Sequence, residues 1–136
     1  MSVVKELIRT EKNGNISFGN YLLDEKSKVS DYEHNGDLYK VKTFKEITKL
    51  ERNGMFVYES VPGTTVTQLS LDANGISFEV EGSEDAQITL ELEPETEYKV
   101  SVSDGPENSM KTNLGGKLVL SVELSQDAPV SVVVTK

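Results

Sequence analysis

One histidine and a large set of carboxylates are the side chains that could do acid–base chemistry in this chain. His34 is the sole histidine and there is no cysteine, so a nucleophilic triad would need His34 as its base. No Gly-x-Ser-x-Gly elbow is present to hold a serine nucleophile. His34 directly precedes Asn35-Gly36, a pair typical of hairpin turns. The pattern favours a surface histidine beside a turn over a catalytic base.

Glycoside hydrolysis is the chemistry that paired carboxylates would do. It needs two carboxyl groups held roughly 5–10 Å apart on opposite sides of a sugar. The chain has 23 Asp and Glu residues, so some pair meets this distance by chance, and the sequence singles none out. We therefore expect no enzyme activity, no catalytic residue and no cofactor, and we keep a small glycoside hydrolase as an alternative. Five glutamates fall on outward positions of expected strands, where solvation is their simplest role: Glu79, Glu81, Glu91, Glu93 and Glu123.

Three acidic residues near the same turn are weak candidates for a metal site. They are Asp31, Glu33 and Asp37, and the stretch that begins at Asp31 matches the start of a calcium loop. Such a loop needs a bidentate glutamate at its twelfth position, where this chain has Lys42. An acidic hairpin is the simpler interpretation, so we expect no metal site.

A pair of tyrosines beside the histidine is the best candidate for a ligand-binding surface. With a two-residue loop, Tyr32 faces Tyr39 across the hairpin, and His34 lies on the same side. Together with Tyr58, these rings could stack on a sugar or on a partner protein. The alternative is that the rings pack in the protein's own core.

Turn signals divide the chain into many short segments. Asn-Gly pairs, the strongest signal for a two-residue hairpin loop, begin at residues 13, 35, 53 and 74. Residues 5–18 align without gaps to residues 45–58, which indicates two similar hairpins around a third at residues 29–43. Chance similarity between two hairpins explains the same match, because turn chemistry alone forces part of it.

One segment of this region allows two secondary structures. A capping box that begins at Thr43 is compatible with a short helix over residues 44–52. The strand-forming residues 55–58 favour a hairpin instead, with Leu50 opposite Val57. We predict the hairpin.

From residue 64 onward, apolar and polar residues alternate. Side chains of a strand alternate between its two faces, so each apolar set lines a buried face. The alternation predicts about seven strands, the size of an immunoglobulin-like sandwich. The expected inward positions are Ile76, Phe78, Val80, Ile88, Leu90, Leu92, Tyr98, Val100, Val102, Leu118, Leu120, Val122, Leu124, Val130, Val132 and Val134.

A run in this half resembles the Leu-x-Pro-x-Thr-x-Tyr-x-Val motif of fibronectin type III domains. The matching residues are Leu92, Pro94, Thr96, Tyr98 and Val100. The resemblance implies a structural role for Pro94 and Tyr98, with the tyrosine hydroxyl bonded back to nearby backbone. The chain has no tryptophan, and about three strands follow Tyr98, more than the family has. Bacterial immunoglobulin-like and transthyretin-like modules therefore stay open.

Composition restricts the partners that we expect. The net charge is −9, and no Lys/Arg cluster is evident along the sequence, so we expect neither nucleic acid nor an anionic membrane as a partner. No secretory leader, no membrane-spanning run and no cysteine are present, which favours a cytoplasmic location. The whole chain also resembles small, uncharacterised acidic bacterial proteins. Some of these carry the label endosialidase, which the residues here do not support.

The sequence thus predicts an all-β antiparallel protein. We expect N-terminal β-hairpins over residues 1–62 and an immunoglobulin-like or fibronectin-III-like β-sandwich over residues 63–136. The expected function is a non-catalytic protein-interaction or structural β-module, which binds a protein partner or self-associates as a homo-oligomer to cover exposed strand edges. A carbohydrate-binding module that uses the surface tyrosines is the alternative.

Overall fold

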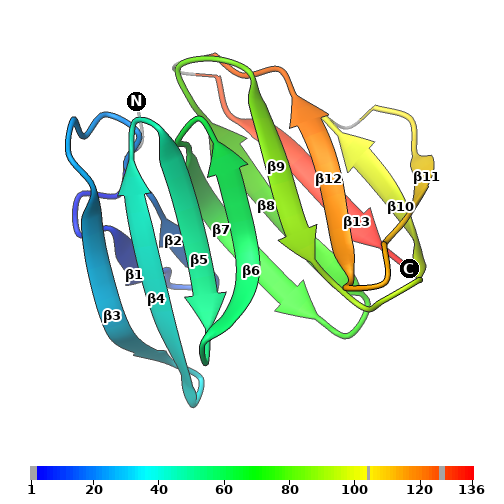
Figure 1. Cartoon of the computed structure of the whole chain (residues 1–136), viewed down its shortest axis with the longest axis horizontal. Coiled ribbons are helices and arrows are strands. Elements are labelled where there is room, and N and C mark those ends of the chain that lie inside the picture. Colours follow the sequence, from blue (N-terminus) through cyan, green and yellow to red (C-terminus); the bar gives the residue numbers. More distant parts are fainter. Residues whose placement is uncertain (1–2, 104, 126–127) are drawn as a thin grey trace.

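The computed structural model of the chain describes residues 3–103, 105–125 and 128–136, and these residues form two antiparallel sheets that face each other (Figure 1). The predicted all-β antiparallel class is confirmed. In the described ranges there is no helix, and hence none long and apolar enough to cross a membrane.

Each sheet combines strands from both halves of the chain. The two sheets are named A and B below. Sheet A has the order β1 (Ile8–Thr10), β2 (Ile16–Phe18), β7 (Thr65–Asp72), β8 (Gly75–Glu81), β13 (Val130–Thr135), β10 (Glu97–Val102) and β11 (Asn108–Lys111). Sheet B has the order β12 (Lys117–Val122), β9 (Ala86–Glu91), β6 (Met55–Val61), β5 (Ile47–Arg52), β4 (Asp37–Phe44) and β3 (Ser27–His34).

Strand pairing continues across residue 62, where the sequence predicts a boundary. In sheet A, β2 pairs with β7, and in sheet B, β6 pairs with β9. The hairpins of residues 1–62 therefore extend both layers, and their inner faces join the same hydrophobic core. After residue 64 the described chain contains seven strands, β7 to β13, as the alternation predicts.

Tyr98 bonds back to the backbone just upstream of it in the chain. Its ring is buried, and its hydroxyl accepts a hydrogen bond from the backbone N–H of Glu93 at 3.2 Å. The hydroxyl of Thr96 donates to the carbonyl of Pro94 at 2.9 Å and so fixes the turn before β10.

The position of β13 separates this fold from an immunoglobulin domain. In the immunoglobulin arrangement, the last strand lies in the sheet opposite the one that holds the first two strands. Here β13 lies between β8 and β10, in the sheet that also holds β7. The two-layer sandwich is confirmed, whereas the immunoglobulin-like strand order is not.

The inward positions of the C-terminal strands are the predicted ones. Ile76, Phe78 and Val80 of β8 are buried, as are most of their counterparts on β9, β10, β12 and β13. The other expected positions, Leu92, Val102 and Val130, are partly buried and pack against the core. At the centre, the ring of Tyr58 makes edge-to-face contacts with Phe18 and Phe78, with ring centroids 5.3 and 5.6 Å apart. One expected role is wrong, because Glu81 on the outer side of β8 is buried and not solvated.

Two of the four Asn-Gly pairs form the predicted two-residue loops. At residues 35–36 and 53–54 both residues have positive φ, which the turn type requires. The pair at residues 13–14 lies in a longer loop between β1 and β2. At Asn74-Gly75 the prediction is wrong, because the loop is Ala73-Asn74 and Gly75 is already the first residue of β8. Asp72 Oδ1 closes that turn by accepting from the backbone N–H groups of Asn74 and Gly75.

Over residues 44–52 the chain forms the end of β4, a turn and the hairpin strand β5, and not a helix, but two registers differ from expectation. A bulge next to Leu50 brings it opposite Tyr58, one residue beyond the predicted Val57. A second bulge in β3 contains Asp31, which has a positive φ of 57°. Alternation alone does not reveal such an extra residue in one strand.

A chain of buried hydroxyl groups fixes the crossing from β6 in sheet B to β7 in sheet A. The Thr64 hydroxyl bonds to the hydroxyls of Tyr58 at 2.8 Å and Ser60 at 2.7 Å. The Thr64 backbone exchanges two bonds with the Thr48 hydroxyl, which also bonds to that of Thr43. All five residues are fully buried, and burial raises the pKa of Tyr58 far above its usual value, so its hydroxyl keeps its proton.

We expect Tyr58→Phe to destabilise the protein by about 1–2 kcal/mol, because a buried hydroxyl loses its partner while the ring contacts remain. Urea unfolding followed by circular dichroism measures the change. Tyr32→Phe is the matched control, because its hydroxyl bonds to Thr10 in an exposed position. If both variants lost the same unfolding free energy, the buried hydroxyl network would contribute no more to stability than an exposed hydrogen bond.

Candidate functional site

The hairpin of β3 and β4 brings the predicted tyrosine pair and His34 together as expected. Tyr32 lies opposite Tyr39, and His34 lies opposite Asp37. Tyr39 is only 5% exposed and Tyr58 is fully buried, both within the hydrophobic core. Tyr32 is half-buried and packs against that core. The faces of these rings therefore serve packing and do not form an open stacking platform.

His34 joins two strands of different sheets. Its Nδ1 lies 3.1 Å from the Thr10 hydroxyl on β1, and that hydroxyl also bonds to Tyr32 at 2.9 Å. Its Nε2 lies 3.2 Å from the side-chain amide of Asn35, and the ring contacts Tyr39 edge to face. Both ring nitrogens thus have partners within the protein, and the contacts close the side of the sandwich between β1 and β3.

The three weak metal candidates have different surroundings in the structure. Asp31 lies in the β3 bulge, Glu33 is exposed, and Asp37 accepts a hydrogen bond from the Asn53 side chain at 2.9 Å. Across the described residues, no group of three or more metal-binding side chains is arranged to hold an ion.

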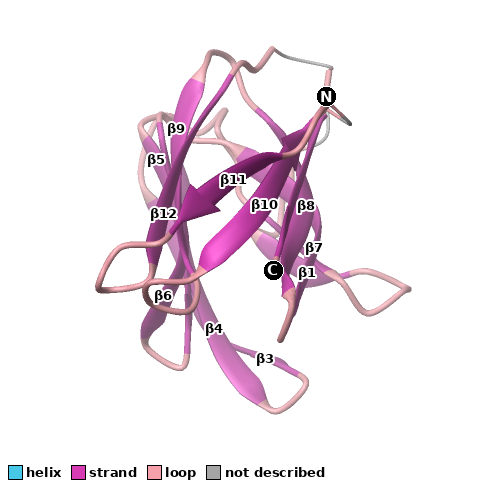
Figure 2. Ribbon diagram, turned by 90° about the vertical axis from the view of Figure 1, so that its right-hand side faces the viewer, coloured by secondary structure: helices cyan, strands magenta, loops and turns pink. Residues whose placement is uncertain are grey.

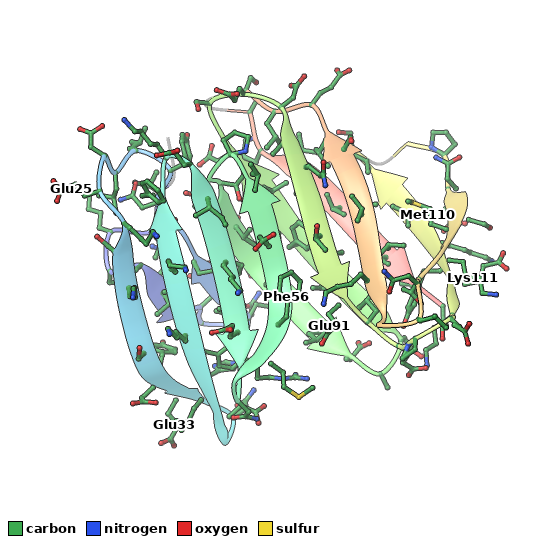
Figure 3. All side chains as sticks on the ribbon, viewed as in Figure 1. Glu25, Glu33, Phe56, Glu91, Met110 and Lys111 are labelled. Atoms are coloured by element: carbon green, nitrogen blue, oxygen red, sulfur yellow. The ribbon has the colours of Figure 1, made fainter. Side chains whose placement is uncertain are left out.

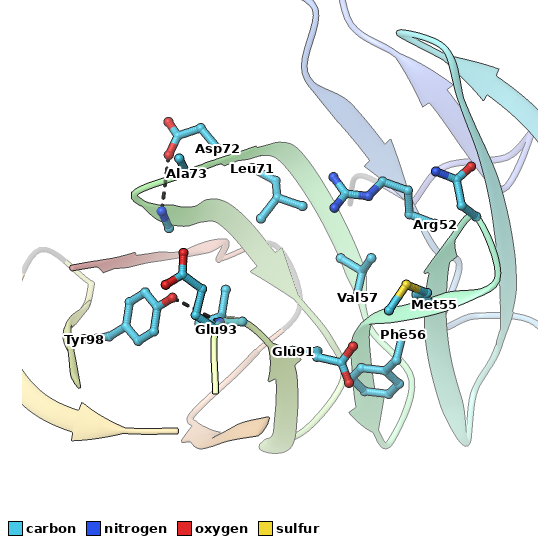
Figure 4. A pocket seen from close by; sticks show the side chains of 13 residues that line it. Arg52, Met55, Phe56, Val57, Leu71, Asp72, Ala73, Glu91, Glu93 and Tyr98 are labelled. Carbon is cyan, nitrogen blue, oxygen red and sulfur yellow. Dashed lines mark hydrogen bonds between the residues drawn. The ribbon is translucent and has the colours of Figure 1, made fainter. Parts of the chain in front are cut away.

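A cleft of about 580 Å³ opens between the two sheets at the end where the β5–β6 and β7–β8 turns lie (Figure 4). This volume lies within the range of small-molecule sites. Arg52 lines the cleft opposite Leu71. The lining residues are Arg52, Asn53, Met55, Phe56, Val57, Leu71, Asp72, Ala73, Gly75, Glu91, Leu92, Glu93 and Tyr98.

The charges of this cleft are engaged with neighbouring groups. Lys117 Nζ lies 2.8 Å from Glu91 and 4.6 Å from the centre of the Phe56 ring. Glu93 is paired with Lys136 at 2.6 Å. Asp72 holds its own turn, as described above. The cleft therefore contains carboxylates with assigned structural partners and lacks an obvious acid–base pair.

Arg52 marks the cleft end nearest the predicted tyrosines. It bonds to the hydroxyl of Tyr39 on the neighbouring strand β4. Burial raises the pKa of Tyr39, and this bond partly offsets the effect. The sequence does not single out Arg52, because its direction into the cleft depends on the register of β5.

Carboxylates also gather on the outer face of sheet A. Glu11, Glu79 and Glu81 line a depression of about 370 Å³ together with Arg9. The pKa of Glu11 is lowered, chiefly by the hydrogen bond from the buried hydroxyl of Ser17 and further by Arg9, whose Nε lies 3.0 Å away. Glu11 is thus held ionised, whereas a general acid needs a raised pKa.

A groove of about 310 Å³ lies between the edges of the two sheets, where β12 faces β10 and β11. Apolar side chains line it together with a nearly equal share of polar atoms, and Figure 3 marks Met110 at its β11 side. Val119 of β12 is 47% exposed beside it. The groove residues are Val100, Val102, Pro106, Asn108, Met110, Val119, Leu120 and Ser121.

Within the described part of the chain, the backbone of β12 has no strand partner on the side that faces this groove. Leu92 N–H donates to the Gly116 carbonyl, and the unbroken ladder from there pairs Leu118 and Leu120 with β9. Because backbone groups alternate in direction along an antiparallel strand, Val119 and Ser121 direct theirs away from β9. β12 is thus an edge with free donors and acceptors next to this groove.

The expectation of no basic cluster is wrong. The outer face of β3, β4 and β5 gathers lysines that lie far apart in the sequence, including Lys28, Lys42 and Lys49 in one row across the strands. These lysines become neighbours only through the register of the strands, so the cluster cannot be found by reading along the sequence.

Comparison of the chain with protein-family models, with curated proteins and with solved structures found no match in any of the three.

We expect Ser17→Ala to reduce stability by about 1–2 kcal/mol at pH 7, because the ionised Glu11 loses a hydrogen bond. The folded-state pKa of Glu11 lies below its ordinary value of 4.5, so this stabilisation is present above that pH. It is lost as the pH falls through the folded-state pKa. The difference in unfolding free energy between the two proteins should therefore become smaller in acid.

The Glu11→Gln background is the control for this prediction. Ser17 also accepts from the backbone N–H of Gln68, so its removal carries a cost that does not depend on pH. In the Glu11→Gln background only that cost should remain. A gap between Ser17→Ala and the parent that stays constant from pH 7 to pH 3 would contradict the assignment to Glu11.

Proposed function

We propose that this protein is a non-catalytic interaction module that binds an extended segment of a partner protein as an added strand on β12. The observation that carries the proposal is the free, unbulged edge of β12 beside this groove. Strand addition supplies affinity through main-chain hydrogen bonds and specificity through alternate side chains that enter a groove.

The other three sheet edges are less suited to receive a strand. β1 and β11 have only three and four residues. β3 has eight, but a bulge interrupts it, and charged residues such as Lys28 and Glu33 lie along it. Short length, bulges and charge are the features that discourage edge pairing. β12 has six residues paired without interruption to β9.

The shape of this side favours one added strand over a second folded copy. β10 and β11 extend beyond β12 (Figure 1), and β11 runs across this side of the molecule in front of β10 (Figure 2). An added strand would lie over the apolar side chains of Val102 and Met110. A two-fold copy would bring its own β10 and β11 into the same space. Self-association is therefore the less favoured form of the proposal.

The partner segment that fits is extended and apolar at alternate positions. The net charge of −9 favours basic residues at the positions between them. A cytoplasmic location stays part of the proposal on the basis of the missing cysteines. Carbohydrate binding receives less support, because Tyr39 and Tyr58 are buried.

The test uses hydrogen exchange of the Val119 and Ser121 amides, measured by NMR with and without a (Lys-Val)4 peptide. We expect the peptide to slow exchange at both amides at least tenfold, and an (Glu-Val)4 peptide to have a weaker effect. Ser121→Pro removes an outward N–H without breaking the ladder to β9, so it should abolish the protection. Unchanged exchange at both amides with either peptide would refute the proposal.

Glu33→Pro on β3 is the matched control. Leu38, the partner of Glu33, directs its backbone groups to Asn53, so Glu33 also points its N–H outward at an edge. This variant should bind the peptide like the parent. Light scattering tests the self-associating form: a dimer that persists in Ser121→Pro would place association elsewhere and count against β12.

A further inference from the structure

The outer face of sheet B carries a row of lysines in direct register. Lys28 of β3 lies opposite Lys42 of β4, and Lys42 lies opposite Lys49 of β5. Paired strands are about 4.8 Å apart. Like charges directly opposite one another destabilise a sheet. This row contains two pairs of directly opposed lysines, although acidic residues outnumber basic ones in the chain. The arrangement therefore costs stability.

Further lysines surround this row. Lys40 lies on the same face of β4, and Lys26 precedes β3. We call Lys26, Lys28, Lys40, Lys42 and Lys49 the lysine face. Figure 3 shows side-chain nitrogen atoms, in blue, over β3, β4 and β5. Burial lowers the pKa of Lys42, and the charges of the other four lysines lower it further.

Acidic residues flank this face on both sides, since the β3 bulge that contains the exposed Asp31 lies opposite Lys40, and two glutamates lie on β5 and β6. Glu51 lies opposite Lys40 and 3.9 Å from Lys49, and Glu59 lies opposite Lys49 on β6. No ion pair is found for Lys28, Lys40 or Lys42 within the described residues. The cations of β3 and β4 are therefore left to solvent or to a ligand.

We propose that the lysine face is a docking surface for an acidic segment of a partner protein. The face is three strands wide and holds a small depression of about 120 Å³ beside Lys40, Lys42 and Lys49, which suits a short peptide segment. It contains lysines without arginine, so it lacks the planar groups that bind phosphate in a bidentate way. These features favour carboxylates over phosphates as the ligand.

This surface is independent of the β12 edge. β12 and β3 are the two opposite edges of sheet B, and the lysine face lies at the β3 end. The two surfaces also select opposite charges, so failure at one leaves the other standing.

The test measures fluorescence anisotropy of a labelled deca-glutamate peptide with the full chain at 20 mM and 300 mM salt. We expect binding that weakens at least tenfold at high salt. Lys42→Glu should weaken it at least tenfold, and Lys99→Glu on β10 in the other sheet should change it less than twofold. No binding at 20 mM salt, or equal loss in both variants, would overturn the proposal. Tighter binding of labelled dT10 than of the peptide would overturn it in favour of nucleic acid.

The Lys42→Gln variant distinguishes loss of the charge from misfolding, because the two would change thermal stability in opposite directions. Removing the central like charge should raise the midpoint of thermal unfolding while it weakens peptide binding at least threefold. A variant that loses stability, or that gains stability without losing binding, would contradict the assignment. If the free protein formed a salt-sensitive dimer, and Lys42→Glu abolished it, the lysine face would bind a second copy of this chain. That result would overturn the proposal of a separate acidic partner.

Discussion

The crossing from β6 to β7 is the constraint on which the arrangement of the two sheets depends. Here the chain leaves sheet B and enters sheet A, and its backbone must be satisfied inside the core. Thr64 does this with Thr48, Tyr58 and Ser60, all fully buried. The surrounding backbone approaches so closely that only glycine fits. A Cβ on Gly63 would lie 1.9 Å from the Phe44 carbonyl oxygen, and one on Gly19 would lie 2.5 Å from that of Thr64.

This crossing also explains why the two halves of the chain share one core. Tyr58, whose hydroxyl anchors the crossing, contacts Phe18 from the N-terminal hairpin and Phe78 from β8. The sheets are therefore held in one orientation by a residue that touches both layers. Inward side chains fill the space between the two sheets but do not reach the sheet edges and the turns. The cleft and the side groove lie at these places.

Alternation of apolar and polar residues was enough to predict the strands of the C-terminal half, because burial of one face is a strong local signal. It could not predict bulges, so the partner of Leu50 was wrong by one residue. It also could not show that Tyr39 and Tyr58 face inward, since tyrosine is compatible with either face. The lysine row illustrates the remaining gap: Lys28, Lys42 and Lys49 are separated along the chain and meet only through the register of three strands.

The central place of β13 in sheet A has a consequence for biosynthesis. β8 and β10 flank it, so neither can complete its hydrogen bonding until residues 130–135 have been translated. Until then, the exposed flank of β8 is a temporary site for wrong pairing on the ribosome. The pairing of β13 with strands made long before it also raises the mean sequence separation of contacts, which slows folding. The layer that contains Tyr98 is thus finished only after most of the opposite layer has already been made.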